Sequence, residues 1–171
     1  TPTTNAVENI SAALGGSSPN LGRTDQIDGG SASDVMTIAT DGNFLLGFST
    51  GYIKNVETLN FNTTVTSVTT KLINLTGVSG VETFNIGASK ANVKLSELTD
   101  VGNTINVSGL ASGTFEVQFA SGAISASGSA MTLGVSDIGS TGTAVSMITQ
   151  GVTDLTIASS GNQKTENFVD L

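Results

Sequence analysis

The chain contains no cysteine, no histidine and no tryptophan, and these absences remove whole classes of protein. Without cysteine there is no disulfide framework and no thiolate metal site. Without histidine, the Ser-His-Asp and Cys-His catalytic arrangements and the usual zinc sites are excluded. A metal bound by this chain is therefore expected to be a hard cation with oxygen ligands, calcium first.

Positive charge is also scarce, because six Lys and Arg stand against 14 Asp and Glu, and the net charge is −8. This balance argues against nucleic acid and anionic membrane surfaces as partners. The sequence has no apolar run of roughly eighteen residues and no basic-then-apolar signal peptide at its start. We therefore expect no nucleic-acid partner and no membrane insertion. The start at Thr1 rather than at Met indicates an excised domain or a processed chain.

Small polar residues and glycine make up much of what is present. The 171 residues include 25 Thr, 21 Ser and 21 Gly, but only two Pro. Thr and Val favour strands, whereas Gly, Asn and Ser supply tight turns. This composition predicts an all-β protein with many short strands.

An internal repeat gives the strands a regular spacing. The segment "IKNVETLNF" (53–61) matches "VSGVETFNI" (78–86) with a shift of 25 residues, and "ITQGVTDLTI" (148–157) is a weaker third copy. Six short apolar-x-apolar segments follow one another at steps of 23, 25, 21, 26 and 24 residues, and they begin at Met36, Leu59, Phe84, Ile105, Met131 and Leu155. Second apolar segments with a period of two lie between them, at 71–75, 93–98, 115–119 and 144–148.

A steady step of about two dozen residues made of short strands is typical of a β-solenoid, in which stacked rungs bury a common core. We predict a parallel β-solenoid of about six rungs over residues 24–171, and the alternative is an antiparallel β-sandwich. Residues 1–23 are expected to form an N-terminal cap or linker. The segment "TNAVENISAAL" (4–14) predicts a short helix with Thr4 or Asn5 as its N-cap. The middle residue of each rung's first strand, Thr or Asn, is expected to face outward, or to form a ladder of like residues if it faces inward.

The stretch "TDQIDGGSASDVMTI" (24–38) is the candidate functional site. It places Asp25, Asp28 and Asp34 around the pair Gly29-Gly30, in a chain with few charges. Asp-Gly is a common turn dipeptide, so these carboxylates have a purely structural interpretation. Three carboxylates within ten residues favour instead a cation site.

Residues 29–37 resemble the RTX nonapeptide, Gly-Gly-x-Gly-x-Asp-x-apolar-x, with Ala32 in place of one glycine. In that motif, glycine turns point carbonyls inward and the aspartate adds charge, so that calcium is coordinated between turns. The motif occurs once here rather than in tandem. The resemblance implies a calcium site formed by Asp25, Asp28, Gly30 and Asp34, in which the first two replace the ligands of a neighbouring repeat.

The "DQIDGGSASDVMTI" turn (25–38) followed by "IKNVETLNF" resembles RTX-type surface-layer proteins of Gram-negative bacteria, such as those of Caulobacter and Campylobacter. The matching motifs lie within residues 25–86. In the rest of the chain the resemblance rests on the composition and on the spacing of the repeats. It implies a calcium-stabilised solenoid that leaves the cell by type I secretion and folds on the extracellular bacterial surface. The same pattern occurs in large secreted adhesins.

Two other functions have weaker support. Glu57 and Glu82 recur in the Val-Glu-Thr repeat, and stacked rungs would bring them about 4.8 Å apart, as a paired-carboxylate glycosidase requires. The simpler explanation is that each glutamate is an exposed residue repeated at the start of a strand. A polysaccharide lyase would need basic residues near a carboxylate cluster, and only Arg23 adjoins the acidic turn. The segment "TTVTSVTT" (63–70) suggests an ice-binding threonine row, but neighbouring rungs do not repeat it.

The sequence therefore predicts a structural protein rather than an enzyme: a self-assembling unit of a bacterial surface layer that uses calcium as its cofactor. Its expected partners are further copies of itself, with cell-surface polysaccharide as another candidate. An adhesin or other type I-secreted surface-binding protein is the alternative. A polysaccharide-active β-helix enzyme is the third hypothesis.

Overall fold

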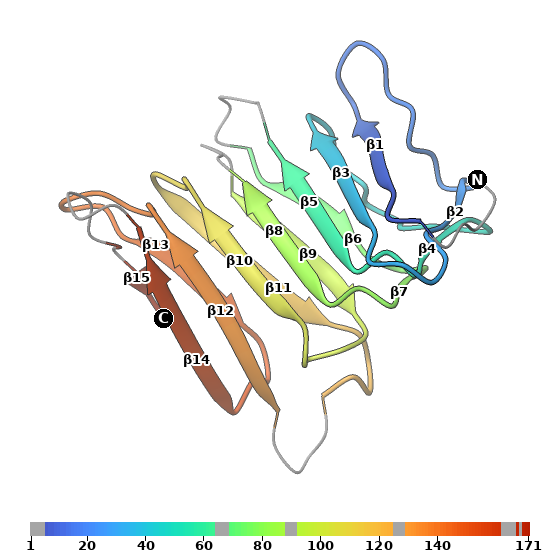
Figure 1. Cartoon of the computed structure of the whole chain (residues 1–171). Helices are drawn as coiled ribbons and strands as arrows, with labels where there is room; N and C mark the ends of the chain where they lie inside the picture. Colours follow the sequence, from blue (N-terminus) through green and yellow to red (C-terminus); the bar gives the residue numbers. More distant parts are fainter. Residues whose placement is uncertain (1–5, 64–68, 88–91, 125–128, 162–166, 168) are drawn as a thin grey trace.

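The computed structural model describes residues 6–63, 69–87, 92–124, 129–161, 167 and 169–171. The described chain is all-β, and its strands coil into a parallel β-solenoid of about six turns (Figure 1). The predicted fold class is therefore confirmed, and the sandwich alternative is wrong because consecutive turns pair in parallel. The described residues include no helix with the length and apolar character needed to cross a membrane.

One face of the solenoid is a seven-stranded parallel sheet. Each turn contributes one strand to it, and neighbours in the sheet come from successive turns. In spatial order its strands are β1 (Asn9–Leu14), β3 (Val35–Thr40), β5 (Thr58–Asn62), β8 (Thr83–Gly87), β10 (Thr104–Ser108), β12 (Ala130–Ser136) and β14 (Asp154–Ser160).

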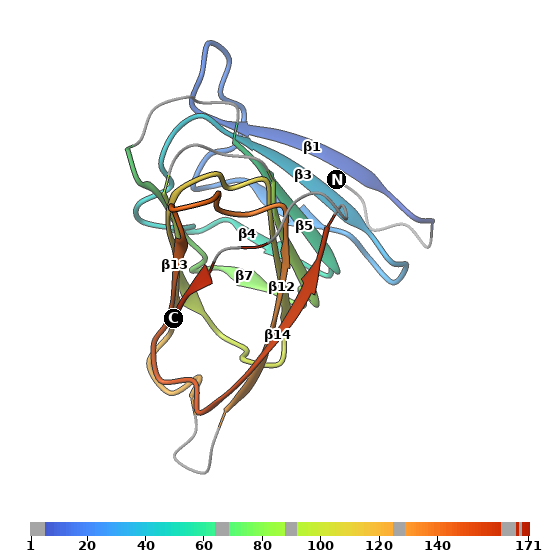
Figure 2. The same ribbon diagram turned by 90° about the vertical axis from the view of Figure 1, so that its left-hand side faces the viewer.

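A second sheet of five strands forms the opposite face (Figure 2). It consists of β6 (Lys71–Asn74), β9 (Val93–Leu98), β11 (Gly113–Phe119), β13 (Val145–Thr149) and β15 (Val169–Asp170). The first four of these are the second apolar segments that the sequence predicts. A third, short sheet lies beside the early turns alone and contains β2 (Gln26–Asp28), β4 (Tyr52–Lys54) and β7 (Val78–Ser79).

The core lies between the sheets and is filled by alternate residues of each strand. In β5, Leu59 and Phe61 are buried, whereas Thr58 and Asn60 face outward and are half-buried. Parallel pairing in register places like residues above one another, so that Leu59 lies between Met36 and Phe84. The period of two in the sequence thus becomes one continuous apolar column.

The N-terminal segment differs from the prediction. Residues 9–14 form strand β1, paired in parallel with β3, and the predicted helix is wrong. Ile10, Ala12 and Leu14 alternate toward the core, and this period of two fits the end of an existing sheet. The region predicted as a cap therefore supplies the terminal strand of the seven-stranded sheet, while Thr4 and Asn5 lie outside the described residues.

The register of β12 also differs from the prediction. The sequence aligned Ile105 with Met131, but the structure pairs Ile105 with Leu133, two residues later. The period of two is the same for both alignments, so the faces are assigned correctly while the register slips by one pair. The rest of the strand ladder, from Met36 to Ile105, pairs as predicted.

The outer face of the seven-stranded sheet carries two polar rows. Asn85 donates from Nδ2 to Asn60 Oδ1 at 2.8 Å, and Asn106 donates to Asn85 Oδ1 at 2.9 Å. Asn60 continues the ladder to Thr37 Oγ1 at 3.3 Å. These middle residues therefore both face outward and form a ladder, two outcomes that the prediction treated as alternatives.

The second row consists of threonines in register on the five successive strands from β5 to β14: Thr58, Thr83, Thr104, Thr132 and Thr156. It differs from the predicted row at 63–70, of which residues 64–68 lie outside the described chain. Figure 2 shows β1 and β3 running at a clear angle to β12 and β14, so the sheet twists along the stack. A row that follows this twist does not present the flat face that ordering an ice lattice requires.

Candidate functional site

The acidic turn connects β2 to β3 at the start of the three-sheet region. Gly29 N donates to Lys54 O at 3.1 Å, which holds the turn against the next rung. A Cβ on Gly29 would lie 1.9 Å from Asn55 O and 2.7 Å from Asp34 Oδ2, so no larger residue fits. Gly30 has φ +103°, a conformation that favours glycine. The two glycines are therefore required by close approach and by backbone conformation, respectively.

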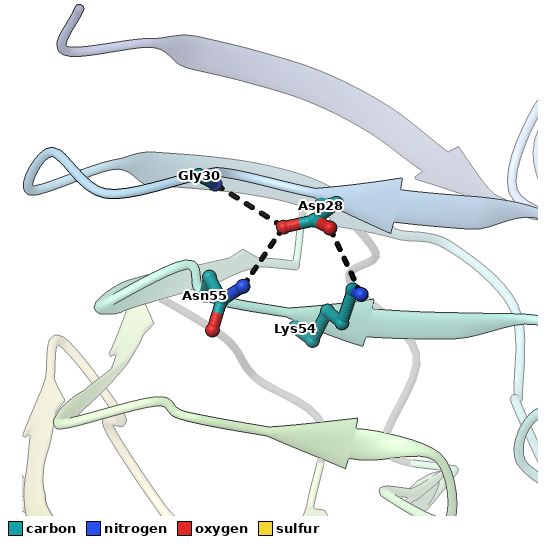
Figure 3. A network of polar contacts seen from close by, with 4 residues as sticks. All are labelled: Asp28, Gly30, Lys54 and Asn55. Atoms are coloured by element: carbon teal, nitrogen blue, oxygen red, sulfur yellow. Dashed lines mark hydrogen bonds and ion pairs between the residues drawn. The ribbon is translucent and has the colours of Figure 1, made fainter. Parts of the chain in front are cut away.

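Asp28 is the centre of a polar network between two rungs (Figure 3). Its Oδ2 lies 2.9 Å from Lys54 Nζ, and its Oδ1 accepts hydrogen bonds from Asn55 Nδ2 at 2.9 Å and Gly30 N at 3.3 Å. The hydrogen bond from Lys54 is the largest influence that lowers the pKa of Asp28, and that from Asn55 follows. The same contact raises the pKa of Lys54. Asp28 is thus held as a carboxylate by protein donors.

Lys54 has a second contact within its own rung. Its Nζ lies 5.0 Å from the centroid of the Tyr52 ring, within the range of a cation–π interaction. The lysine side chain remains 42% exposed, against 16% for Asp28, so solvent screens the pair. The network therefore fixes the geometry of the turn more than it stabilises the fold.

Asp25 closes a separate turn. Its Oδ2 accepts a hydrogen bond from Gly22 N at 2.7 Å, and its backbone carbonyl accepts one from Tyr52 N at 2.8 Å. Asp25 therefore directs one carboxylate oxygen into the loop before β2, away from the partners of Asp28.

Asp34 is fully buried, with no exposed surface. Its Oδ1 accepts a hydrogen bond from Glu8 N at 2.6 Å, and its own N–H donates to Glu57 Oε2 at 2.7 Å. Its Oδ2 has no hydrogen-bond partner among the described residues. A buried carboxylate oxygen without a partner costs free energy, and a bound cation or water would remove that cost.

The four predicted ligand residues lie within one turn of the chain, but the three carboxylates among them have different hydrogen-bond partners. Among the described residues, no three carboxylates gather around a common point that could hold a metal ion. Calcium binding by Asp25, Asp28, Gly30 and Asp34 therefore stays a prediction. Asp34 Oδ2 and Asn55 O both lie near the position of a Cβ on Gly29, at 2.7 and 1.9 Å from it.

Asp34 also belongs to a column of residues that precede the strands of the large sheet. Glu57 follows it one rung later, and its carbonyl accepts hydrogen bonds from the N–H groups of Glu82 and Thr83, both at 2.9 Å. Glu57 thus uses its side chain on one rung and its carbonyl on the next, which is a structural role. Glu82 is exposed.

Sequence reasoning missed Lys54 and Asn55 at this site. Both lie in the repeat "IKNVETLNF", one rung away from the acidic turn, and a step of about 25 residues places them beside Asp28 and Gly29. The repeat period was therefore a signal that could have found them, because residues one period apart are neighbours in a solenoid.

The sequence matches no family model, no curated protein and no solved structure.

Proposed function

We propose that this chain is a structural unit of a bacterial surface layer, a calcium-stabilised β-solenoid that assembles with further copies of itself. The observation that carries the proposal is the buried Asp34 at a Gly-Gly turn between two rungs, whose Oδ2 has no hydrogen-bond partner in the described part of the chain. Calcium takes six to eight oxygen ligands from carboxylates, backbone carbonyls and water. Asp34 Oδ2 and Asn55 O are the first donors that would hold it, with water completing the shell.

The solenoid itself supports a structural role. Its core runs the length of the stack, and the outer face of its large sheet is covered by short polar side chains. Within the described residues, β1 and β14 each have one partner strand in that sheet. Free edges of parallel sheets are templates for pairing with another chain, which supports self-association.

The test is a calcium titration of the full chain, followed by circular dichroism and size-exclusion light scattering. We expect calcium to raise the midpoint of thermal unfolding and to drive assembly. Binding to the folded state alone at a hundredfold excess over Kd adds about 2.7 kcal/mol. The substitution Asp34→Asn should abolish both effects, and Asp154→Asn, which removes an exposed carboxylate on β14, should leave both unchanged.

The variants Asp25→Asn and Asp28→Asn complete the series and test the rest of the predicted ligand set. A loss of calcium affinity in either would add that carboxylate to the site. If the chain is equally folded and monomeric in chelator, the acidic turn is only a turn. The alternative function, an adhesin or other type I-secreted surface-binding protein, would then take the lead.

A further inference from the structure

A cavity of about 290 Å³ lies where the third sheet ends. In the turn before it, the chain passes from β6 to β8 through the short strand β7, but residues 99–103 connect β9 to β10 without such a strand. The place that a fourth strand of the small sheet would fill is therefore open. Ser79, at the end of β7, and the following Gly80 line this space. β7 is the last strand of the small sheet, and on its outer side Val78 N donates to Leu75 O at 2.9 Å.

The floor of the cavity is apolar. It is formed by five buried side chains that belong to the core: Leu75, Val78, Val81, Phe84 and Leu98. These side chains offer no ligand atoms to a metal ion, whereas a ligand with an alkyl chain would bury apolar surface against them.

The polar groups of the cavity are hydrogen-bond acceptors. Asn103 is 7% exposed, and its Nδ2 donates to Val81 O, which leaves its Oδ1 without a partner among the described residues. Asp100 accepts a hydrogen bond from Gly102 N at 2.8 Å through Oδ1, so its Oδ2 is available. Asn103 lines the cavity, so its Oδ1 would accept a hydrogen bond from a ligand donor there.

Glu97 brings a second carboxylate to the same space. The register between β9 and β11 shifts at this point, since Val117 pairs with Leu95 and Phe119 pairs with Leu98. The extra residue is a β-bulge, and Glu97 within it has φ +62°. Bulges redirect side chains, and Glu97 lines the cavity instead of following the alternation of β9. Among the residues that the structure describes, no Lys or Arg lines the cavity to neutralise these carboxylates.

We propose that this cavity binds the lysine side chain of an extended peptide segment. The alkyl chain of the lysine lies on the apolar floor, and its ammonium group donates to Glu97, Asp100 and Asn103 Oδ1. The peptide backbone lies along the outer side of β7 and so takes the place of the missing strand, a common mode of peptide recognition. Such a site is distinct from the acidic turn at Gly29-Gly30, and it does not depend on calcium there.

The experiment titrates the full, ¹⁵N-labelled chain with the peptide acetyl-Ala-Lys-Ala-methylamide and follows amide chemical shifts. We expect saturable shifts at residues 79–80 and 97–103. A peptide with norleucine in place of lysine should bind at least about tenfold more weakly, because it keeps the alkyl chain and lacks the ammonium group. Equal binding of the two peptides, or shifts confined to other residues, would overturn the proposal.

Substituted variants distinguish the loss of carboxylate charge in the cavity from a general effect on folding. Glu97→Gln and Asp100→Asn together should weaken the lysine peptide at least about tenfold and leave the norleucine peptide unaffected. Asp154→Asn, far along the stack on β14, serves as the control and should bind the lysine peptide as the parent does. A calcium titration gives the decisive competitor: if calcium shifts the same amides and displaces the peptide, the cavity is a metal site and the peptide proposal fails.

Discussion

Two parts of the solenoid differ in the number of their faces. The three-faced part, residues 26–87, has strands in all three sheets, whereas the described residues of the two-faced part, 93–124 and 129–160, contribute none to the small sheet. In the three-faced part each small strand directs one apolar residue to the core, and these residues are in register: Ile27, Ile53 and Val78. A residue with positive φ then follows and turns the chain into the large sheet: Gly30, Asn55 and Gly80.

Two of the three small strands, β4 and β7, lie at the copies of the repeat that contains Val-Glu-Thr, whereas β2 precedes the Gly29-Gly30 turn. Val56 and Val81 of that repeat are buried, directly after the turn residue. The weaker copy at 148–157 forms part of β13 and β14 with a turn between them and contributes no small strand. A partial match to the repeat therefore preserved the large sheet but not the third face.

The largest effects are expected from matched core truncations, one in each part. Phe61 in β5 and Phe115 in β11 are both buried, and Phe→Ala at either site should cost about 3–5 kcal/mol. Because each rung contacts its neighbours, we expect the loss of hydrogen-exchange protection to be centred on the part that carries the substitution. Mass-spectrometric exchange measures this, and an equal loss of protection in both parts would show a single cooperative unit.

A smaller but local effect is expected at the acidic turn. Gly29→Ala would place a methyl group 1.9 Å from Asn55 O, and the backbone must move apart, at a cost of about 3 kcal/mol. Gly22→Ala is the control, because its added Cβ would lie 3.7 Å from Asp25 Oδ2, an ordinary contact. Urea unfolding should separate the two variants clearly. A near-neutral Gly29→Ala would mean that the turn is looser than the structure shows.

The asparagine ladder crosses the boundary between the two parts and should couple them. Asn85→Ala removes two hydrogen bonds, one to Asn60 and one from Asn106, so we expect a loss of about 1–2 kcal/mol. Asn62→Ala, on the same face but exposed, is the matched control and should change the stability little. Chemical denaturation of both variants tests this. Equal effects would show that the ladder contributes no more than an exposed asparagine.

The smallest effect concerns one ion pair from each part, Lys54–Asp28 and Lys94–Glu116, both with a distance of 2.9 Å. The pKa of Asp28 is lowered by folding from its usual value of 3.8, so its contribution to stability is present above about pH 4. That contribution disappears as the pH falls through the lowered pKa. Asp28→Asn should therefore lower the stability at neutral pH and converge with the parent in acid.

The pKa of Lys54 is raised by folding, so its contribution to stability depends on pH in the opposite direction. Its contribution is present below pH 10.5 and is lost as the pH rises through the raised pKa. Thermal unfolding of the parent and of Asp28→Asn at a series of pH values measures both limits. A constant difference between the two proteins across the acid range would contradict a role for the charge on Asp28.

Much of the fold could be predicted, because the repeat and the period of two are local properties of the sequence. Leu59 and Phe61 were assigned to one strand of a rung and are buried there as expected. Residues 9–14 were misassigned, since a segment with a plausible helix cap takes the strand conformation when a sheet edge is available for pairing. The register of β12 was missed because Met131 and Leu133 both satisfy the apolar pattern.

The candidate site was located by its carboxylates, but their partners come from other rungs. Asp28 contacts Lys54 and Asn55, and Asp34 contacts Glu8 and Glu57. The unpaired Oδ2 of Asp34 is a property of that packing, and no pattern around residue 34 indicates it.

The sequence by itself determined the class of fold, six of the seven strands of the large sheet and the absence of histidine and cysteine chemistry, because composition and alternation act locally along the chain. The tertiary structure alone decided which oxygens are satisfied, where the third face ends and where a cavity opens beneath β7. These features depend on how residues about one turn apart meet, and that is fixed by the lengths of the connections and the twist of the stack.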